Sequence, residues 1–220
     1  MCCNDTEAKV WIASFPRSGN HRTREAIYSL LFNRPFEYEL VEKGSSLLIK
    51  ALEETRDAGY KKTHKKAGFL DGPVIYLVRH PLEVALSWNK FIPSQTPQMA
   101  ADFVANGRRP EWGSWAQNVE SFIDRPDTLI IRYEDWGTEA LKKICDFCGL
   151  PYNERVLYWN HYYVILEKER ELMKTAGPRY HQHLHEHSDG EVEKIFSREH
   201  IDQIISACSE TMKKVGYGDN

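Results

Sequence analysis

The sequence predicts an α/β fold, a single domain in which helices cover both faces of a mainly parallel central sheet. Three short apolar runs, which begin at Val10, Val74 and Thr128, are each followed closely by residues at helical spacing. Parallel strands require such crossovers, because the end of one strand and the start of the next lie at opposite edges of the sheet. The sequence contains no internal repeat and no linker, so we expect one domain over residues 1–220.

The composition excludes several classes of function. Hydrophobic residues make up 41% of the chain and charged residues 28%, as in a soluble globular protein. A net charge of −3 argues against general nucleic-acid binding. No apolar run approaches the roughly 20 residues of a membrane-spanning helix, and the N-terminus shows no secretion signal. Five cysteines without regular spacing suit a reducing compartment, so we expect a cytoplasmic protein.

The first strand and helix enclose a loop that is suited to binding an anion. The apolar run from Val10 ends before Pro16, and a turn of small and polar residues leads to Asn20. Unpaired backbone N–H groups and the helix dipole both favour an anion at such a helix N-terminus. The side chains that add donors at the same point are Arg17, Ser18, Asn20 and His21.

The spacing of this loop differs from that of the nucleoside triphosphatases. Their loop reads Gly-x4-Gly-Lys-Ser/Thr, and its last hydroxyl holds magnesium. Counted from Gly19, Ser14 replaces the first glycine, and Asn20 and His21 replace the lysine and the hydroxyl residue. The loop is therefore of another kind, and an ordinary strand-to-helix turn remains the alternative.

Between the first and second apolar runs, the sequence predicts one helix and a basic segment. Apolar residues at 47, 48, 51 and 52 indicate a helix that is capped by Ser45 or Ser46 and stops at Gly59. Residues 60–66 contain four lysines and one histidine. Such a run is usually a solvated loop, but it could equally face the anion that the first loop holds.

The second apolar run, Val74–Val78, has the β-branched character of a central parallel strand. The next residues are Arg79-His80-Pro81, and proline suits the first position of a helix, where no N–H is needed. This turn places Arg79 at the end of the strand and Ser87 in the helix that follows. Open α/β sheets bind ligands at this edge, so two strand ends are expected to carry anion-binding residues.

The remainder of the chain completes the α/β pattern. Residues 93–115 are predicted to form a lid or an acceptor-side region with short helices, in which Trp112 and Trp115 lie in the acceptor pocket or in the core. A strand at Thr128–Tyr133 precedes helices at about 138–148, 153–174 and 197–215. The histidines at 181, 183, 185 and 187 indicate a metal site or, more simply, a loop that closes over substrate.

Four separated stretches together resemble the sulfotransferases that use 3′-phosphoadenosine 5′-phosphosulfate (PAPS). In the family's order they are Phe15–Asn20, Lys62–His64, Tyr76–Ser87 and Ile131–Asp135. The resemblance implies a sulfotransferase fold with a P-loop-like turn, and transfer of a sulfuryl group from PAPS to a hydroxyl or amine of a small-molecule or glycan acceptor. It implies that no metal is required, and it leaves the acceptor and the oligomeric state open.

The resemblance also implies a set of cofactor-binding residues. The loop of Arg17, Ser18, Gly19 and Asn20 would hold the 5′-phosphosulfate, with Arg17 standing where the family often has lysine. Arginine suits this position, because it stays charged and can hold two oxygens at once. The 3′-phosphate would be held by Arg79 and Ser87, and the adenine would lie near Tyr133.

Three residues would carry the chemistry. His64 stands where the family has its general base, and a neutral histidine can accept the acceptor's proton. Lys62 and Arg17 would neutralise charge on the transferring group.

The chain departs from the family at two places. Arg22 replaces an aromatic residue that stacks on adenine, although a guanidinium can also stack on a base. The family's C-terminal Arg-Lys-Gly and Gly-Asp-Trp patterns, which also contact the 3′-phosphate, are not recognisable; Arg179 or Arg198 could replace them.

Two other functions compete with sulfuryl transfer. A small nucleotide-dependent kinase would use Asp135, at a strand end, to hold Mg²⁺. A module that binds 3′-phosphoadenosine 5′-phosphate (PAP) without turnover would explain the missing C-terminal pattern. The acceptor itself cannot be read from loop composition, and the loops expected to bind it are 35–45, 91–115 and 160–190.

Overall fold

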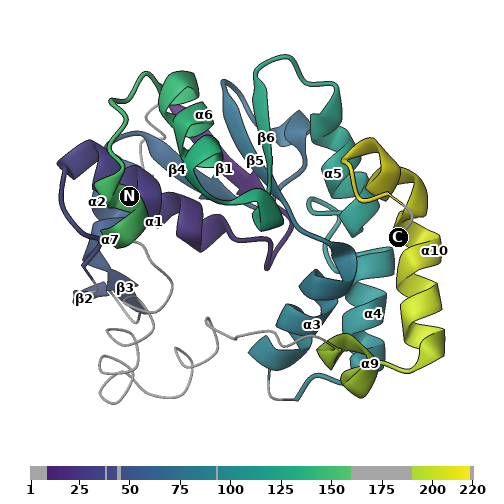
Figure 1. The fold of residues 1–220 in the computed structure, drawn as a ribbon. Helices are drawn as coiled ribbons and strands as arrows, with labels where there is room; N and C mark the ends of the chain where they lie inside the picture. Colours follow the sequence, from purple (N-terminus) through teal and green to yellow (C-terminus); the bar gives the residue numbers. More distant parts are fainter. Residues whose placement is uncertain (1–8, 38, 44–45, 93, 160–189, 219–220) are drawn as a thin grey trace.

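A computed structural model of the protein describes residues 9–37, 39–43, 46–92, 94–159 and 190–218. Its central sheet confirms the predicted α/β class, because all of its strands are parallel (Figure 1). The strand order is β4-β1-β5-β6. These strands are β1 (Val10–Ser14), β4 (Tyr60–Thr63), β5 (Val74–Val78) and β6 (Thr128–Arg132).

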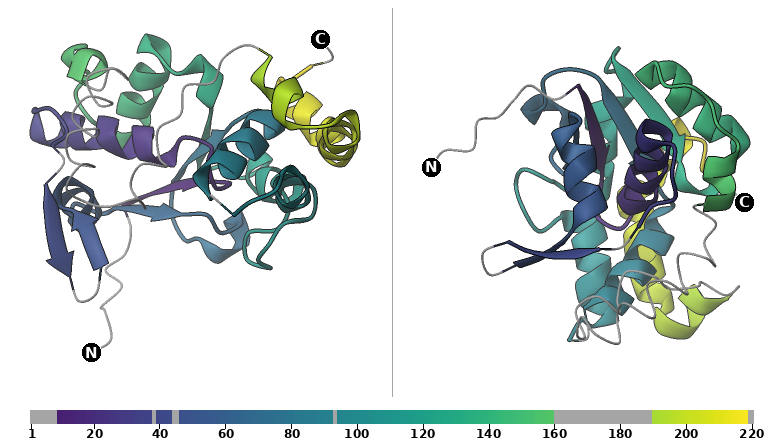
Figure 2. Two further views of the ribbon diagram at one scale, coloured as in Figure 1. Left: turned by 90° about the horizontal axis from the view of Figure 1, so that it is seen from below. Right: turned by 90° about the vertical axis from the view of Figure 1, so that its left-hand side faces the viewer.

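Helices cover both faces of this sheet, as expected for buried parallel strands. The described helices are α1 (Asn20–Phe32), α2 (Lys50–Asp57), α3 (Pro81–Phe91), α4 (Pro97–Asn106), α5 (Trp115–Ile123), α6 (Thr138–Cys148), α7 (Arg155–Trp159), α9 (Glu191–Ile195) and α10 (Arg198–Lys214). Figure 1 and the two views of Figure 2 show α3, α4, α9 and α10 gathered on one side of the molecule, away from α1, α2 and α7.

Alternate residues of each inner strand pack into two different cores. On β5, Val74, Tyr76 and Val78 join the core that also holds residues of α3, α4, α5 and α10. Ile75 and Leu77 join the second core, with residues of α1 and α6. This alternation puts every side chain of β5 in an apolar layer, because successive side chains of a strand point to opposite faces.

The predicted helix that starts at Ser45 or Ser46 is wrong over its first part. Residues 46–49 form β3 (Ser46–Ile49), which pairs antiparallel with β2 (Leu40–Lys43), and helix α2 begins only at Lys50. Helical spacing is a local signal, whereas this ladder depends on a partner strand some residues away. The end of the helix agrees with the prediction, since α2 ends at Asp57 and Gly59 follows at φ 95°.

The basic segment at 60–66 is not simply a solvated loop. Its first part forms β4 at the edge of the sheet, in parallel register with β1. Tyr60 and Thr63 are buried, and the lysines between them are on an edge strand, where lysine discourages pairing with other chains. The sheet therefore has one strand more than the three apolar runs indicated.

The prediction of short helices within residues 93–115 is confirmed by α4, but the lid alternative does not fit this helix. Helix α4 is a structural element, because Ala100, Ala101, Phe103 and Val104 are buried in the core. Trp115 is fully buried and is a core residue. The predicted helix 197–215 corresponds to α10, and the helix 138–148 to α6.

Two regions lie wholly or partly outside the described residues. The predicted helix 153–174 is described only as α7, and the histidines at 181–187 and Arg179 fall in the undescribed part. Within the described ranges, no helix has the length and apolar character needed to cross a membrane. In the same ranges, no three His, Cys, Asp or Glu side chains come together as a set that could hold a metal ion.

Candidate active site

The loop between β1 and α1 lies at the carboxyl edge of the sheet and has an unusual backbone. Arg17 has φ 73° and Gly19 has φ 92°, both in the left-handed region. A Cβ atom on Gly19 would approach Cδ2 of Tyr133 to 2.3 Å. A glycine is needed here for two reasons, because the backbone is left-handed and an aromatic ring lies against it.

The N-terminus of α1 is open to an anion. No side chain caps the helix there, and no acidic residue lies in its first turn. Ser18 is fully buried, and its Oγ has no hydrogen-bond partner in the described part of the chain. Buried polar groups are nearly always paired, so a hydroxyl without a partner in the described part, beside a helix N-terminus, indicates a place for a ligand.

Asn20 fastens the loop to the sheet rather than pointing outward. Its Nδ2 donates to the carbonyl oxygen of Ile12 at 2.8 Å and lies 3.4 Å from Oγ of Ser14. Its Oδ1 is buried and has no partner among the described residues. The side chain therefore positions the start of α1 against β1.

Two arginines, Arg17 and Arg79, lie close together between the loop and α3. Nε of Arg17 donates to Oγ of Ser87 at 3.0 Å, and Nη1 of Arg79 lies 3.4 Å from the carbonyl oxygen of Arg17. Burial, and next the charge of Arg79, lower the pKa of Arg17 to about 10, so it remains charged at neutral pH. Nη2 of Arg79 pairs with Glu83 at 3.2 Å, while its buried Nε has no partner in the described part.

The last residue of β1 fixes the ring of His64 through a hydrogen bond. Its Nδ1 lies 2.8 Å from the carbonyl oxygen of Ser14. A carbonyl oxygen can only accept, so Nδ1 carries the proton and Nε2 carries the lone pair. The ring also lies edge-on to Trp112, with 5.8 Å between the ring centroids. Burial, and next the charge of Lys62, lower the pKa of His64 to about 3, which keeps the ring neutral at pH 7.

Lys62 lies on β4, two residues before His64. Lys62 is exposed to solvent, yet enough protein lies around its ammonium to desolvate it in part. Desolvation, and next the charges of Arg24 and Arg17, lower the pKa of Lys62 to about 8. No ion pair joins Lys62 to a carboxylate in the described part of the chain, so its charge is available to a ligand.

Aromatic and guanidinium groups line the other end of the loop. Arg79 lies over the ring of Tyr133, at 4.4 Å from its centroid. Arg22 lies 5.8 Å from the centroid of Tyr133 and 5.2 Å from that of Trp136. Nε2 of His21, which was predicted to be a donor of the loop, contacts Oε1 of Glu25 at 3.0 Å.

Comparison with known proteins identifies the family. The sulfotransferase domain profile matches residues 7–216. The chain belongs to the sulfotransferase domain family. No curated protein sequence matches it.

Solved sulfotransferase structures share the fold at low sequence identity. A crystal structure of mouse sulfotransferase SULT7A1 complexed with PAP superposes with a TM-score of 0.66 at 19% identity, covering 94% of this chain and 84% of that one. Retinol dehydratase with retinol and PAP gives 0.64 at 15% identity, covering 96% and 83%. Retinol dehydratase with androsterone and PAP gives 0.63 at 15% identity, covering 93% and 80%.

Three residues around the site of this sulfotransferase were not predicted from the sequence to be site residues. Glu83, one turn into α3, neutralises part of the charge of Arg79. Trp136 packs against Arg22, and its position directly after Ile131–Asp135 was a usable signal. Arg24, one turn along α1 from Asn20, lies near Lys62. It follows a run of polar residues at the start of the helix, so no pattern in the sequence distinguishes it.

Two residues considered from the sequence are placed elsewhere. Arg198 pairs with Asp202 at 3.0 Å, and 86% of its side chain is exposed, so it faces solvent rather than the nucleotide site. Asp135, the metal ligand of the kinase hypothesis, pairs with Arg132 through both oxygens, at 2.7 and 2.8 Å. Both carboxylate oxygens are thus engaged by an arginine, which disfavours the Mg²⁺-binding role of the kinase hypothesis.

Proposed function

We propose that the protein transfers a sulfuryl group from PAPS to a hydroxyl or amine of a small-molecule or glycan acceptor. One observation carries the proposal. Arg17 and Arg79 converge at the end of β5, next to buried donors on Ser18 and Arg79 that have no partner in the described part of the chain. A pair of adjacent cations with unused donors is suited to a polyanion, and PAPS carries two separate anionic groups.

The residues present fit this cofactor. The open amides at the start of α1 and the hydroxyl of Ser18 would hold the 5′-phosphosulfate. Arg79 and Ser87 would hold the 3′-phosphate, and Arg17, which already contacts Ser87, would reach both groups. Tyr133 and Arg22 would flank the adenine. The PAP molecules in the similar mouse and retinol dehydratase structures support this choice of nucleotide.

His64 would act as the general base. PAPS supplies a sulfuryl group joined to a phosphate that leaves as PAP. Because Nδ1 of His64 donates to the carbonyl oxygen of Ser14, its Nε2 is the atom that accepts the proton of the acceptor. The anionic cofactor would raise the pKa of this histidine from its depressed value, because it would offset the charges of Lys62 and Arg17.

Lys62 and Arg17 would stabilise the charge that develops during transfer. Both are cationic at neutral pH and both act electrostatically on His64. Fixed cations at the reacting group stabilise the transition state without a metal ion, as donors do in phosphoryl transfer.

Product analysis tests the proposal directly. The purified protein is incubated with ³⁵S-labelled PAPS and a panel of phenols, alcohols and amines, and in parallel with ATP and Mg²⁺. We expect labelled sulfate esters or sulfamates together with an equal amount of PAP. Phosphorylated products from ATP would contradict the proposal, and tight PAP binding with no labelled product would instead favour the inactive binding module.

A further inference from the structure

A cationic side chain that has no role in the proposed cofactor site also faces the proposed base. Arg24 lies on α1 one helical turn after Asn20, whose amide binds the carbonyl oxygen of Ile12 on β1. Lys62 pairs with Ile12 across β4 and β1, and paired side chains of neighbouring strands point to the same face. Helical side chains also lean toward the N-terminus of their helix. Arg24 therefore leans toward the strand ends, over the face that carries Lys62.

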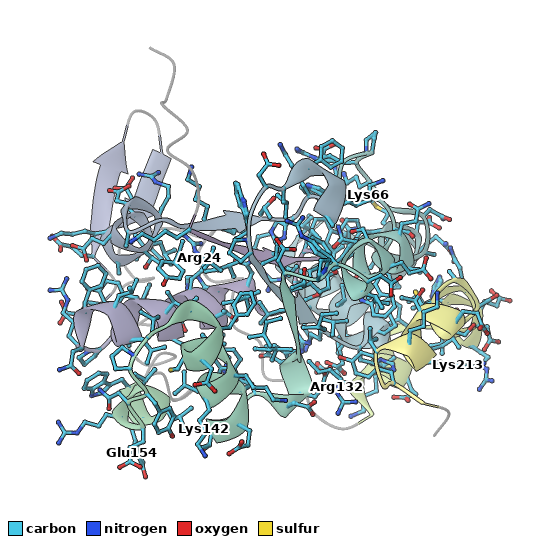
Figure 3. The ribbon with its side chains drawn as sticks, turned by 90° about the horizontal axis from the view of Figure 1, so that it is seen from above. Arg24, Lys66, Arg132, Lys142, Glu154 and Lys213 are labelled. Atoms are coloured by element: carbon cyan, nitrogen blue, oxygen red, sulfur yellow. The ribbon has the colours of Figure 1, made fainter. Side chains whose placement is uncertain are left out.

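The guanidinium of Arg24 is only partly satisfied. Its Nη2 makes a long hydrogen bond of 3.5 Å to the carbonyl oxygen of Leu52, which places it between α1 and α2 (Figure 3). Its Nε is buried and has no partner in the described part of the chain. No carboxylate in that part forms an ion pair with it. Arg24 as a whole is only partly exposed, and a buried guanidinium nitrogen without a partner is costly, so its presence favours an anionic ligand.

Arg24 and Arg17 both lie near Lys62, but they have different charged neighbours. After burial, Arg79 is the main influence that lowers the pKa of Arg17. The pKa of Arg24 is lowered to about 10 by burial, and its charged neighbours are Glu25 and Arg56. Lys62 is influenced by both Arg24 and Arg17. The two arginines near Lys62 are bonded to different helices, Arg24 to the carbonyl oxygen of Leu52 on α2 and Arg17 to Ser87 on α3.

We propose that Arg24 forms, beside Lys62, a subsite for an anionic group of the acceptor, and that this enzyme sulfates hydroxyl or amine compounds that carry a carboxylate. The inference rests on the proposed function. The nucleotide occupies the side of Arg17 and Arg79, so the acceptor approaches His64 from the side of Arg24. A guanidinium can bind a carboxylate through two parallel hydrogen bonds, which would fix the orientation of the acceptor as well as its affinity.

Matched acids and esters test this subsite. Hydroxybenzoate and hydroxyphenylacetate isomers are titrated beside their methyl esters into PAP-saturated protein, with binding followed by ligand-observed NMR. For at least one pair, we expect the carboxylate to bind about tenfold or more tightly than its ester, the size of a hydrogen bond between charged groups. Arg24→Gln should abolish that preference, and Arg24→Lys, which keeps the charge, should retain part of it.

Arg56→Gln is the matched control, because it removes one positive charge from a half-exposed arginine that pairs with Asp57. It should retain the full preference for the carboxylate. Equal affinity of acid and ester in the wild type, or a preference that survives Arg24→Gln, would overturn the subsite. A loss of PAP affinity in Arg24→Gln would also overturn it, by placing Arg24 in the nucleotide site. A wild-type protein that does not bind PAP would instead show that the proposed function has failed.

Discussion

An arginine lies at each end of the central strands, Arg125 at the amino ends and Arg79 at the carboxyl ends, and the two are bonded in opposite ways. Arg125 lies where β5 and β6 begin, and it donates to the carbonyl oxygens of Ala67 and Leu70 at 2.9 and 3.0 Å and to that of Gly72. Its Nε pairs with Asp127 at 2.6 Å. Arg79, where β5 ends, has one long bond to a carbonyl oxygen, one ion pair with Glu83 and a buried Nε without a partner in the described part.

This difference separates a stabilising arginine from a ligand-binding one. All three nitrogens of Arg125 bind backbone or carboxylate oxygens, so that edge of the sheet is held together by its own groups. At the other edge, donors of Ser18 and Arg79 are left for something outside the described chain. In this sheet, the groups at the amino ends of the strands stabilise the fold, whereas those at the carboxyl ends are left to bind a ligand.

Replacement of His64 by alanine should give the largest effect on function. Turnover with PAPS should fall by about 10²-fold or more, because the general base is lost. PAP affinity, measured by calorimetry, should change by less than about threefold, since the proposed role of His64 is toward the acceptor. Equal losses of turnover and PAP affinity would mean that His64 has a structural role in the nucleotide site.

Arg125→Ala should reduce stability and leave binding intact. We expect the free energy of unfolding in urea to fall by about 2 kcal/mol, because three carbonyl oxygens and Asp127 lose a charged donor. PAP affinity at a temperature where the variant is folded should match that of the wild type. A variant with unchanged stability would remove the contrast between the two edges.

Arg79→Ala should show the reverse behaviour. PAP affinity should weaken by about 2 kcal/mol, the value of a hydrogen bond from a charged donor to a phosphate. Adenosine 5′-phosphosulfate, which lacks the 3′-phosphate, should bind the variant and the wild type almost equally. If that shorter nucleotide loses as much affinity as PAP, Arg79 does not bind the 3′-phosphate.

The affinity for PAP should fall as the pH rises above 8. The pKa of Lys62 is lowered to about 8, so above this pH the free enzyme loses a positive charge that the bound anion favours. The phosphates of PAP are fully ionised there and do not titrate. Calorimetry should show a loss of about fivefold between pH 8 and 9, and Lys62→Gln should bind PAP weakly with no such dependence.

Asp135→Asn should have the smallest effect. Its ion pair with Arg132 is largely exposed, so stability should fall by less than about 1 kcal/mol. Turnover with PAPS should be unchanged and should not depend on Mg²⁺. A large loss of activity would revive the kinase mechanism, in which this carboxylate holds the metal.

The sequence was sufficient to predict which strand ends carry the site, but not the strand pairing or the hydrogen bonds within the site. Strand-to-helix turns at Pro16–Asn20 and Arg79–Pro81 are local patterns, and both were located correctly. The ladder of β2 with β3 and the strand β4 depend on pairing between segments, which helical spacing and a run of lysines do not reveal. Likewise, the bond of Arg17 to Ser87 joins residues far apart in sequence, so only the structure shows it.

Calorimetric titration of PAP into the wild-type protein without metal, beside ATP with Mg²⁺, tests the central claim most directly. We expect PAP to bind more tightly than ATP, because the donors around Arg79 and Ser87 are matched to a 3′-phosphate that ATP lacks. Tighter binding of ATP with Mg²⁺ would contradict the account and assign this edge of the sheet to a different nucleotide chemistry.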